Sequence, residues 1–287
     1  MRPFEYFEPR TVAEATELLS NYGDKARILA GGIDLLPRIR KGDIKAEYII
    51  NIQKIPGLAY VEQDGKEGLK FGALFKLFSA ETSKTVKENY PILYDAIHQI
   101  TSVQAKYMGT VVGNLCVGTP ASDVATALFA LGAELRIANP KGERTEPLEK
   151  FYLNYFQTSL RRDEMVTGAV LSKPSPGEGS AFLNLVRTHS DIAKVSVAVK
   201  IIIRDGICQE ARIVIGAAAP TVFRTAKAET LIKGQKVTPQ IITQASEAAA
   251  GETRPITDLR STAEYRKEAA RVLVGRGLEK AVERAKA

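Results

Sequence analysis

The sequence predicts an α+β protein, with two α/β subdomains followed by a C-terminal antiparallel sheet and its covering helices. Helical and strand-like apolar patterns alternate over residues 1–172. A stretch rich in Pro, Gly and Ser at 173–180 is typical of a domain linker. Beyond it, the β-branched runs 195–203 and 207–215 are joined by Arg204-Asp205-Gly206, whose Asp-Gly pair favours a hairpin. We therefore expect domains at 1–56, 57–172 and 180–287.

The first subdomain is predicted to begin with a helix. Thr11-Val12-Ala13-Glu14 has the pattern of a capping box, in which the Thr and Glu side chains each accept a main-chain N–H. The apolar residues that follow share one helical face, and Gly23 can end the helix. Two buried strands are then expected at 26–30 and 48–52, before a turn at 54–57 closes the unit.

The remaining two domains are predicted to mix strands and helices. In the second subdomain we expect strands at 58–61, 69–73, 133–138 and 164–171, turns at 63–66 and 139–142, and helices near 92–100 and 123–131. The last domain is expected to add helices at 239–250 and 261–287 to its hairpin. The second of these helices opens with the capping box Ser261-Thr262-Ala263-Glu264.

Composition limits the class of protein. With 287 residues, 45% hydrophobic and 25% charged, the chain is predicted to be globular. It contains no apolar run of the roughly 18 residues that a membrane helix needs, and its first residues lack the apolar stretch of a signal peptide. We therefore expect no membrane span and a cytoplasmic location.

The net charge of +7 raises the question of nucleic acid binding. The densest basic region is 264–286, where Arg and Lys residues, Arg266 among them, alternate with glutamates in a helical pattern. A solvated amphipathic helix explains this pattern better than a basic patch does. We therefore expect no nucleic acid partner.

The sequence contains two cysteines, Cys116 and Cys208. A cysteine-ligated iron–sulfur cluster needs roughly four thiolates, and the two residues show no zinc spacing. We expect both to be small buried hydrophobic residues, and any metal centre to lie on another chain.

Two glycine-bearing segments carry the strongest functional signal. Ala30-Gly31-Gly32-Ile33-Asp34 follows a predicted strand, and Gly109-Thr110-Val111-Val112-Gly113-Asn114 precedes Thr119-Pro120-Ala121-Ser122-Asp123, which predicts a helix start. Glycine lacks the Cβ that would keep a phosphate away from main-chain N–H groups. Neither segment is a P-loop, and the chain has no G-x-G-x-x-G fingerprint. Two converging loops fit a diphosphate, so the sequence predicts a bound dinucleotide. For the first segment alone, an ordinary turn is the alternative.

These segments resemble those of the FAD-binding subunit of xanthine dehydrogenase-family molybdenum hydroxylases. The chain is also similar to the medium subunit of carbon monoxide dehydrogenase and to the FAD subunit of nicotinate dehydrogenase. A third match is Arg187-Thr188-His189-Ser190-Asp191-Ile192-Ala193-Lys194-Val195. Order, spacing and length agree over nearly the whole chain. The resemblance implies a PCMH-type FAD-binding fold, FAD as cofactor, and a flavoprotein oxidoreductase subunit.

The resemblance also implies which residues bind the cofactor, and it implies no catalytic or metal-ligating residue. The residues expected around the diphosphate are Leu29, Ala30, Gly31, Gly32, Ile33 and Asp34. The positions that contact flavin, phosphate or adenosine in the family correspond to Thr101, Thr110, Gly113, Asn114, Asp123, Val166 and Leu183.

Several of these residues have simpler interpretations. Asp123 can be a helix N-terminal residue, Asn114 a turn former that tolerates positive φ, and Asp34 a helix cap. Arg187 and Asp191 either pair with each other or contact the flavin or a partner.

Three positions depart from the family pattern. Val112 stands where a glycine is common, and Ile33 stands where Ser or Thr often gives a hydroxyl to phosphate. We therefore expect fewer side-chain hydrogen bonds to the diphosphate. Leu183 stands where xanthine dehydrogenase-like members carry a lysine near the flavin. Since that cation would stabilise reduced, anionic flavin, its loss is expected to affect the flavin potential and the choice of acceptor.

The resemblance implies an electron-transfer subunit of a heterotrimer, single or doubled. It would take electrons from an iron–sulfur small subunit, which a molybdenum-cofactor large subunit supplies, and pass them to an external acceptor such as NAD or quinone. Two alternatives stay open. One is a stand-alone FAD-dependent reductase of the same broad fold, similar to cell-wall enolpyruvyl reductases. The other is a flavin-free assembly or interaction protein.

Overall fold

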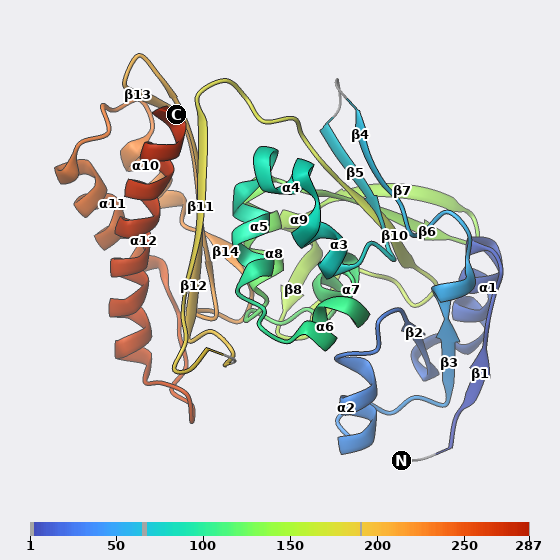
Figure 1. Cartoon of the computed structure of the whole chain (residues 1–287). Coiled ribbons are helices and arrows are strands. Elements are labelled where there is room, and N and C mark those ends of the chain that lie inside the picture. Colours follow the sequence, from blue (N-terminus) through green and yellow to red (C-terminus); the bar gives the residue numbers. More distant parts are fainter. Residues whose placement is uncertain (1–2, 65–67, 190, 287) are drawn as a thin grey trace.

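The computed structural model describes residues 3–64, 68–189 and 191–286. Three parallel strands form a sheet near the N-terminus, at the lower right of Figure 1. They are β1 (Glu5–Phe7), β2 (Ala26–Leu29) and β3 (Tyr48–Asn51), with β3 in the middle. Helices α1 (Val12–Tyr22) and α2 (Leu35–Lys41) make the crossovers that parallel pairing requires.

Helix α1 begins as the sequence predicts. Thr11 Oγ1 accepts a hydrogen bond from the N–H of Glu14 at 3.1 Å, and Glu14 Oε2 accepts one from the N–H of Arg10 at 2.7 Å. Gly23 follows the helix with φ +50°, so the predicted end is confirmed as well. Strand β1 was not expected, because its three residues are mostly exposed and show no apolar alternation.

A five-stranded antiparallel sheet follows. Its members are β4 (Val61–Asp64), β5 (Gly68–Gly72), β10 (Met165–Leu171), β6 (Glu134–Asn139) and β7 (Gly142–Pro147), in this spatial order. The hairpin predicted around 139–142 is confirmed. The strand predicted at 58–61 is wrong in its bounds, because Leu58 and Tyr60 accept hydrogen bonds from Leu74 and Gly72 before the regular ladder begins. Residues 65 and 66 of the predicted 63–66 turn lie outside the described residues.

Short helices lie between this sheet and the C-terminal sheet (Figure 1). They are α3 (Leu77–Thr82), α4 (Lys84–Asn89), α5 (Pro91–His98), α6 (Val103–Met108), α7 (Val111–Cys116), α8 (Asp123–Leu131) and α9 (Leu148–Phe151), with the small hairpin β8 (Tyr152–Asn154) and β9 (Gln157–Thr158) beside them. The predictions for α5 and α8 are confirmed. The prediction of a loop at 109–114 is wrong, because α7 occupies most of it.

The last sheet is antiparallel and lies between two helical layers (Figure 1). It consists of β11 (Glu178–Leu185), β12 (Val195–Arg204), β13 (Ile207–Gly216) and β14 (Phe223–Arg224). Helices α5 and α8 cover one face. The other face carries α10 (Ala226–Ile232), α11 (Pro239–Glu252) and α12 (Ala263–Lys286). The hairpin prediction is confirmed, with Asp205 at φ +51° and Gly206 at φ +77°.

Three details of this domain differ from the prediction. β11 begins at Glu178, inside the expected linker. The first turn of α12 is capped by Thr262, whose Oγ1 accepts a hydrogen bond from the N–H of Tyr265 at 3.2 Å, and not by Ser261. Arg266, expected on a solvated face, is only 4% exposed, since its guanidinium donates to the carbonyls of Lys194 and Ala217.

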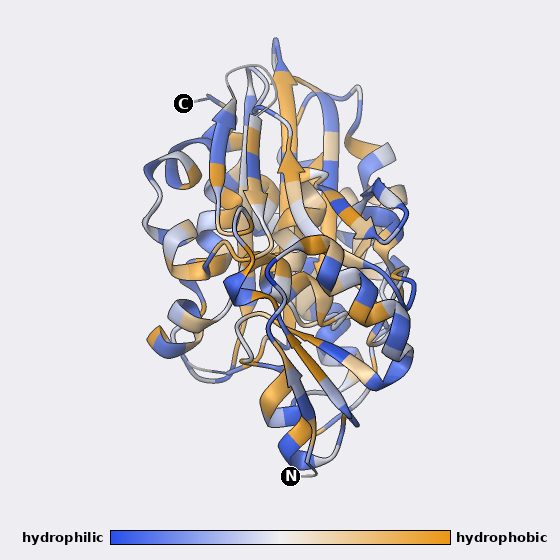
Figure 2. Ribbon diagram, turned by 90° about the vertical axis from the view of Figure 1, so that its right-hand side faces the viewer, coloured by the Kyte–Doolittle hydropathy of each residue, from blue (hydrophilic) through white to orange (hydrophobic). Residues whose placement is uncertain are grey.

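Two large hydrophobic cores support this arrangement. One runs from α1 and β3 through the five-stranded sheet to α8 and includes Ala15, Ile50, Phe71 and Leu128. The second lies between the C-terminal sheet and the C-terminal helices. Figure 2 shows hydrophobic residues concentrated on strands near the centre of the molecule. Within the described ranges, no helix is both long and apolar enough to cross a membrane.

Candidate functional site

The first glycine segment connects β2 to α2 and leaves its main-chain donors free. Within the described part of the chain, the N–H groups of residues 31–34 donate no hydrogen bond. Gly32 adopts φ +75°, a conformation that side chains disfavour. The carbonyl of Ala30 is held by Gln53 Nε2 at 2.5 Å, and Ile33 is 45% exposed. Consecutive N–H groups in such a turn form a concave site for an anion.

Asp34 occupies the N-cap position of α2, but its side chain does not cap the helix. Its side chain makes no hydrogen bond to the first turn, and its Oδ2 atom lies 3.3 Å from Arg38 Nη1. Arg38 also lies over the ring of Phe156, 4.0 Å from the ring centre. The interpretation of Asp34 as a side-chain cap is therefore wrong, and its carboxylate offsets the charge of Arg38.

The second glycine segment has already used most of its donors. Thr110 is the N-cap of α7, and its Oγ1 accepts a hydrogen bond from the N–H of Gly113 at 2.9 Å. The N–H of Asn114 donates to the carbonyl of Thr110, and that of Val111 donates to Phe75. Asn114 lies inside the helix without positive φ, so the alternative interpretation of this residue as a turn former is wrong.

The two segments meet, as the diphosphate hypothesis requires. A Cβ added to Gly31 would lie 2.3 Å from the carbonyl oxygen of Met108 and 2.8 Å from Cα of Gly109. Real side chains do not approach backbone atoms so closely. A glycine is therefore needed at position 31 for the two segments to come together.

Asp123 is the first residue of α8, but it is not the cap. Ser122 caps the helix through its Oγ, which accepts from the N–H of Ala125 at 3.0 Å and donates to Asn114 Oδ1. Asp123 Oδ2 accepts a hydrogen bond from Asn184 Nδ2 at 3.0 Å. Its Oδ1 atom is buried and has no hydrogen-bond partner among the described residues. Burial raises the pKa of Asp123 to about 6, against hydrogen bonding from Asn184 and Ser196, which lowers it.

The other expected site residues are more scattered. Leu29 ends β2, and Thr101 lies half-buried between α5 and α6. Val166 is buried on β10 opposite Ile137. Leu183 on β11 packs into the C-terminal core, with its Cδ1 3.7 Å from a Cβ placed on Gly277 of α12. The structure does not bring Leu183 to Asp123.

Sequence reasoning missed Asn184, the neighbour that does reach Asp123. Successive side chains of a strand point to opposite faces. Since Leu183 packs toward α12, Asn184 faces α8. A strand assignment for 178–185 would have made this visible.

The remaining candidates have structural partners. Arg187 Nε lies 3.5 Å from Asp191 Oδ2, so these two residues pair, and Ser190 between them lies outside the described residues. Burial raises the pKa of the Cys116 thiol to about 12 and that of Cys208 to about 11, so both remain protonated at neutral pH.

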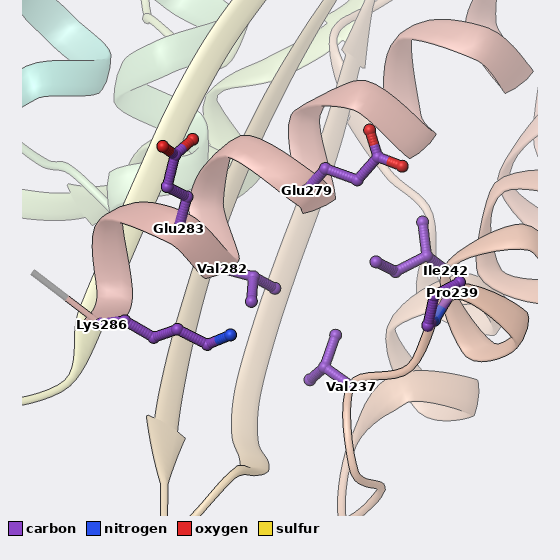
Figure 3. Close-up of a pocket in the computed structure, with 7 residues that line it drawn as sticks. All are labelled: Val237, Pro239, Ile242, Glu279, Val282, Glu283 and Lys286. Atoms are coloured by element: carbon purple, nitrogen blue, oxygen red, sulfur yellow. The ribbon is translucent and has the colours of Figure 1, made fainter.

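An open cavity of about 530 Å³ lies elsewhere, between the start of α11 and the end of α12 (Figure 3). Val237, Ile242 and Val282 form its apolar side, and Glu279 and Glu283 project along its rim. This cavity is on the side of the C-terminal sheet that faces away from the glycine segments (Figure 1). None of the residues expected to bind a cofactor lines it.

Comparison with known proteins decides the family. Residues 2–171 match the model of the FAD binding domain in molybdopterin dehydrogenase. The chain belongs to this family. Residues 180–281 match the CO dehydrogenase flavoprotein C-terminal domain. The cofactor of this molybdopterin dehydrogenase-type subunit is FAD, and the chain is a flavoprotein oxidoreductase component of the xanthine dehydrogenase family.

Relatives of this FAD-binding subunit match it along nearly its whole length. The 6-hydroxypseudooxynicotine dehydrogenase complex subunit alpha of Paenarthrobacter nicotinovorans is 31% identical, over 100% of this chain and 97% of the relative. The carbon monoxide dehydrogenase medium chain of Hydrogenophaga pseudoflava is 30% identical, over 97% of this chain and 96% of the relative. A solved structure of carbon monoxide dehydrogenase from the same organism superimposes with a TM-score of 0.95, at 31% identity and 99% coverage of both chains.

The residues of the FAD-binding subunit fit FAD chemically. FAD presents a diphosphate, which needs N–H donors, and ribose hydroxyls, which need acceptors. The free N–H groups of residues 31–34 can donate to the diphosphate, and the unpaired Oδ1 of Asp123 can accept from a ribose hydroxyl.

Proposed function

We propose that this chain is the electron-transfer subunit of a molybdenum hydroxylase complex, and that residues 31–34 bind the diphosphate of its FAD. The observation that supports the site is the run of N–H groups at residues 31–34 that no other described group uses. Because the turn is half-exposed to exposed, water can satisfy these donors in the absence of a ligand, and they stay available to an anion.

Each part of the site has a distinct role in this proposal. The amides of residues 31–34 donate to the diphosphate, and Gly31 keeps the segment against Met108 and Gly109 so that the amides stay aligned. Asp123 accepts a hydroxyl hydrogen of the adenosine ribose, with Asn184 fixing the other carboxylate oxygen. When bound, FAD supplies one- and two-electron transfer. The chain itself binds and orients the cofactor.

The partners in the proposal come from the relatives. One is named as a subunit of a dehydrogenase complex, and another as the medium chain of carbon monoxide dehydrogenase. We extend this to an iron–sulfur subunit and a molybdenum-cofactor subunit as partners, with NAD, quinone or another carrier as external acceptor. The two cysteines of this sequence are too few to ligate a cluster of its own.

Flavin uptake and substrate oxidation test the proposal separately. The purified full chain is titrated with FAD, and the loaded chain is assayed with purine, N-heteroaromatic, aldehyde and acyl-CoA substrates, alone and within the complex purified from the native source. We expect flavin absorbance and weak dye reduction by the single chain, and substrate oxidation only by the complex. The complex is expected to contain molybdenum and iron.

Two results would overturn the proposal. Substrate turnover by the single chain at the rate of the complex would make it a stand-alone reductase. A colourless chain that takes up no added FAD would make it a flavin-free interaction protein.

A further inference from the structure

One cationic side chain at the junction of the two glycine segments has no role in the site described above. Lys76 lies between β5 and α3, and its main chain pairs with Thr110 in an isolated antiparallel bridge. Its Nζ donates a hydrogen bond to the carbonyl of Met108 at 3.0 Å. This is the same carbonyl that lies 2.3 Å from a Cβ placed on Gly31. Lys76 and Gly31 therefore approach the same carbonyl group.

The charge of Lys76 is not balanced by the protein. Among the described residues, no carboxylate lies within ion-pair distance of its Nζ. Asp34, the acidic residue of the first glycine segment, is engaged by Arg38. Burial lowers the pKa of Lys76, because it removes water from around the ammonium. An anion brought to this junction would relieve that cost.

The sequence of the first segment leaves a place for such a cation. Ile33 cannot supply the hydroxyl that Ser or Thr would give to a phosphate, and the N–H groups of residues 31–34 carry only partial charges. A diphosphate carries full negative charge. The free N–H groups of residues 31–34 and the ammonium of Lys76 therefore belong to the region where the two glycine segments come together. No carboxylate among the described residues forms an ion pair with this ammonium.

We propose that Lys76 binds the diphosphate of FAD and supplies the cationic contact that the glycine segments lack. This inference rests on the proposed placement of the diphosphate at residues 31–34. The side chain reaches the phosphate by exchanging its hydrogen bond to Met108, or by sharing its remaining donors, since an ammonium has three.

Replacement of Lys76 by methionine, which keeps the unbranched stem of the side chain and removes its charged end, tests the proposal. The full-length apoprotein is titrated with FAD, with ADP, which keeps the diphosphate, and with riboflavin, which has no phosphate. In Lys76→Met we expect FAD and ADP to bind about tenfold more weakly and riboflavin to bind as in the wild type. Raising the salt concentration should weaken ADP binding less in this variant than in the wild type.

Two controls accompany the variant. Lys76→Arg keeps the charge and should retain most of the affinity for ADP. Lys84→Met removes a charge from an 86% exposed side chain on the neighbouring helix α4 and should change none of the three affinities. Circular dichroism and melting temperature report whether each variant is folded.

The outcomes separate this inference from the proposed function. If the wild type binds FAD and Lys76→Met binds FAD and ADP equally well, Lys76 is not a phosphate contact, while the proposed function stands. An equal loss of riboflavin and ADP affinity would show that Lys76 only holds the segment through Met108, which also overturns the inference. If the wild type binds neither FAD nor ADP, the proposed function fails and the inference fails with it.

Discussion

The two glycine segments look alike in sequence and differ in the structure. Residues 31–34 form an open turn whose N–H groups are free, whereas residues 111–116 form α7, whose first turn is closed by Thr110. The first segment can donate to an anion, and the second mainly supplies the surface against which Gly31 packs. Glycine spacing therefore indicates where backbones come close, but the hydrogen bonds decide which segment has donors to offer.

The largest expected effect comes from Gly31→Ala. The added Cβ would lie 2.3 Å from the carbonyl oxygen of Met108, so the two segments must separate. We expect this overpacking to cost about 1–3 kcal/mol of stability and to reduce bound flavin to less than roughly a tenth of the wild-type content. Flavin absorbance per protein and the melting temperature measure both effects.

Gly251→Ala is the matched control for that substitution. Gly251 lies in α11 with no atom within 4 Å of the added Cβ, so this variant should keep its flavin and its stability. Full flavin occupancy in Gly31→Ala would show that the close approach of the two segments is not needed for binding.

Asp123→Asn is expected to produce the next largest effect, and one that depends on pH. Burial raises the pKa of Asp123 from 3.8 to about 6, so the folded apoprotein holds this proton more tightly than the unfolded chain does. The charged carboxylate therefore lowers stability above about pH 6, and this cost disappears below about pH 4. Without ligand, Asp123→Asn should be more stable than the wild type by on the order of 2 kcal/mol at pH 8, with no difference near pH 4.

The pH dependence of FAD affinity should be opposite to that of apoprotein stability: a lower pH stabilises the apoprotein but weakens FAD binding. A ribose hydroxyl donates best to the charged carboxylate, so wild-type affinity should fall as the pH drops from 7 to 5, and Asp123→Asn should bind more weakly and without this slope. Titration of both apoproteins with FAD at several pH values measures the affinity and its pH dependence. Identical, flat profiles for both proteins would remove Asp123 from the cofactor site.

Thr110→Ala is expected to have the smallest effect on the cofactor. Loss of the hydroxyl that accepts from Gly113 should cost about 1 kcal/mol of stability, as for other N-caps, and change FAD affinity by less than about threefold. Thr110→Ser should restore the stability. A loss of FAD affinity beyond about tenfold that serine restores would show that the second segment contributes to FAD binding as much as the first does.

The sequence predicted those features of the fold that depend on local patterns. The capping box of α1, the Asp205-Gly206 hairpin and helix α8 all follow from residues close together in the chain. Helix α7 was missed because its two valines and Gly113 have low helix propensity, and the hydrogen bond from Gly113 to Thr110 together with burial of Val111 and Val112 outweighs that preference.

The candidate site was predictable only in part, because some of its contacts join residues that are far apart in the sequence. The meeting of the two segments was expected as a hypothesis, and the contact of Gly31 with Met108 bears it out. The partners of Asp123 and Lys76 come from β11 and α6, far along the chain. No spacing in the sequence encodes such contacts, so Asn184 and Lys76 became visible only in the structure.

Hydrogen exchange of individual backbone amides tests the central claim most directly. Exchange at residues 31–34 and at Gly113 is measured by NMR in the apoprotein and in the protein saturated with FAD. Because the amides of residues 31–34 are free without ligand, FAD should slow their exchange by at least about tenfold, while the Gly113 amide, already bonded to Thr110, should change little. Unchanged exchange at residues 31–34 under full FAD occupancy would contradict the placement of the diphosphate there.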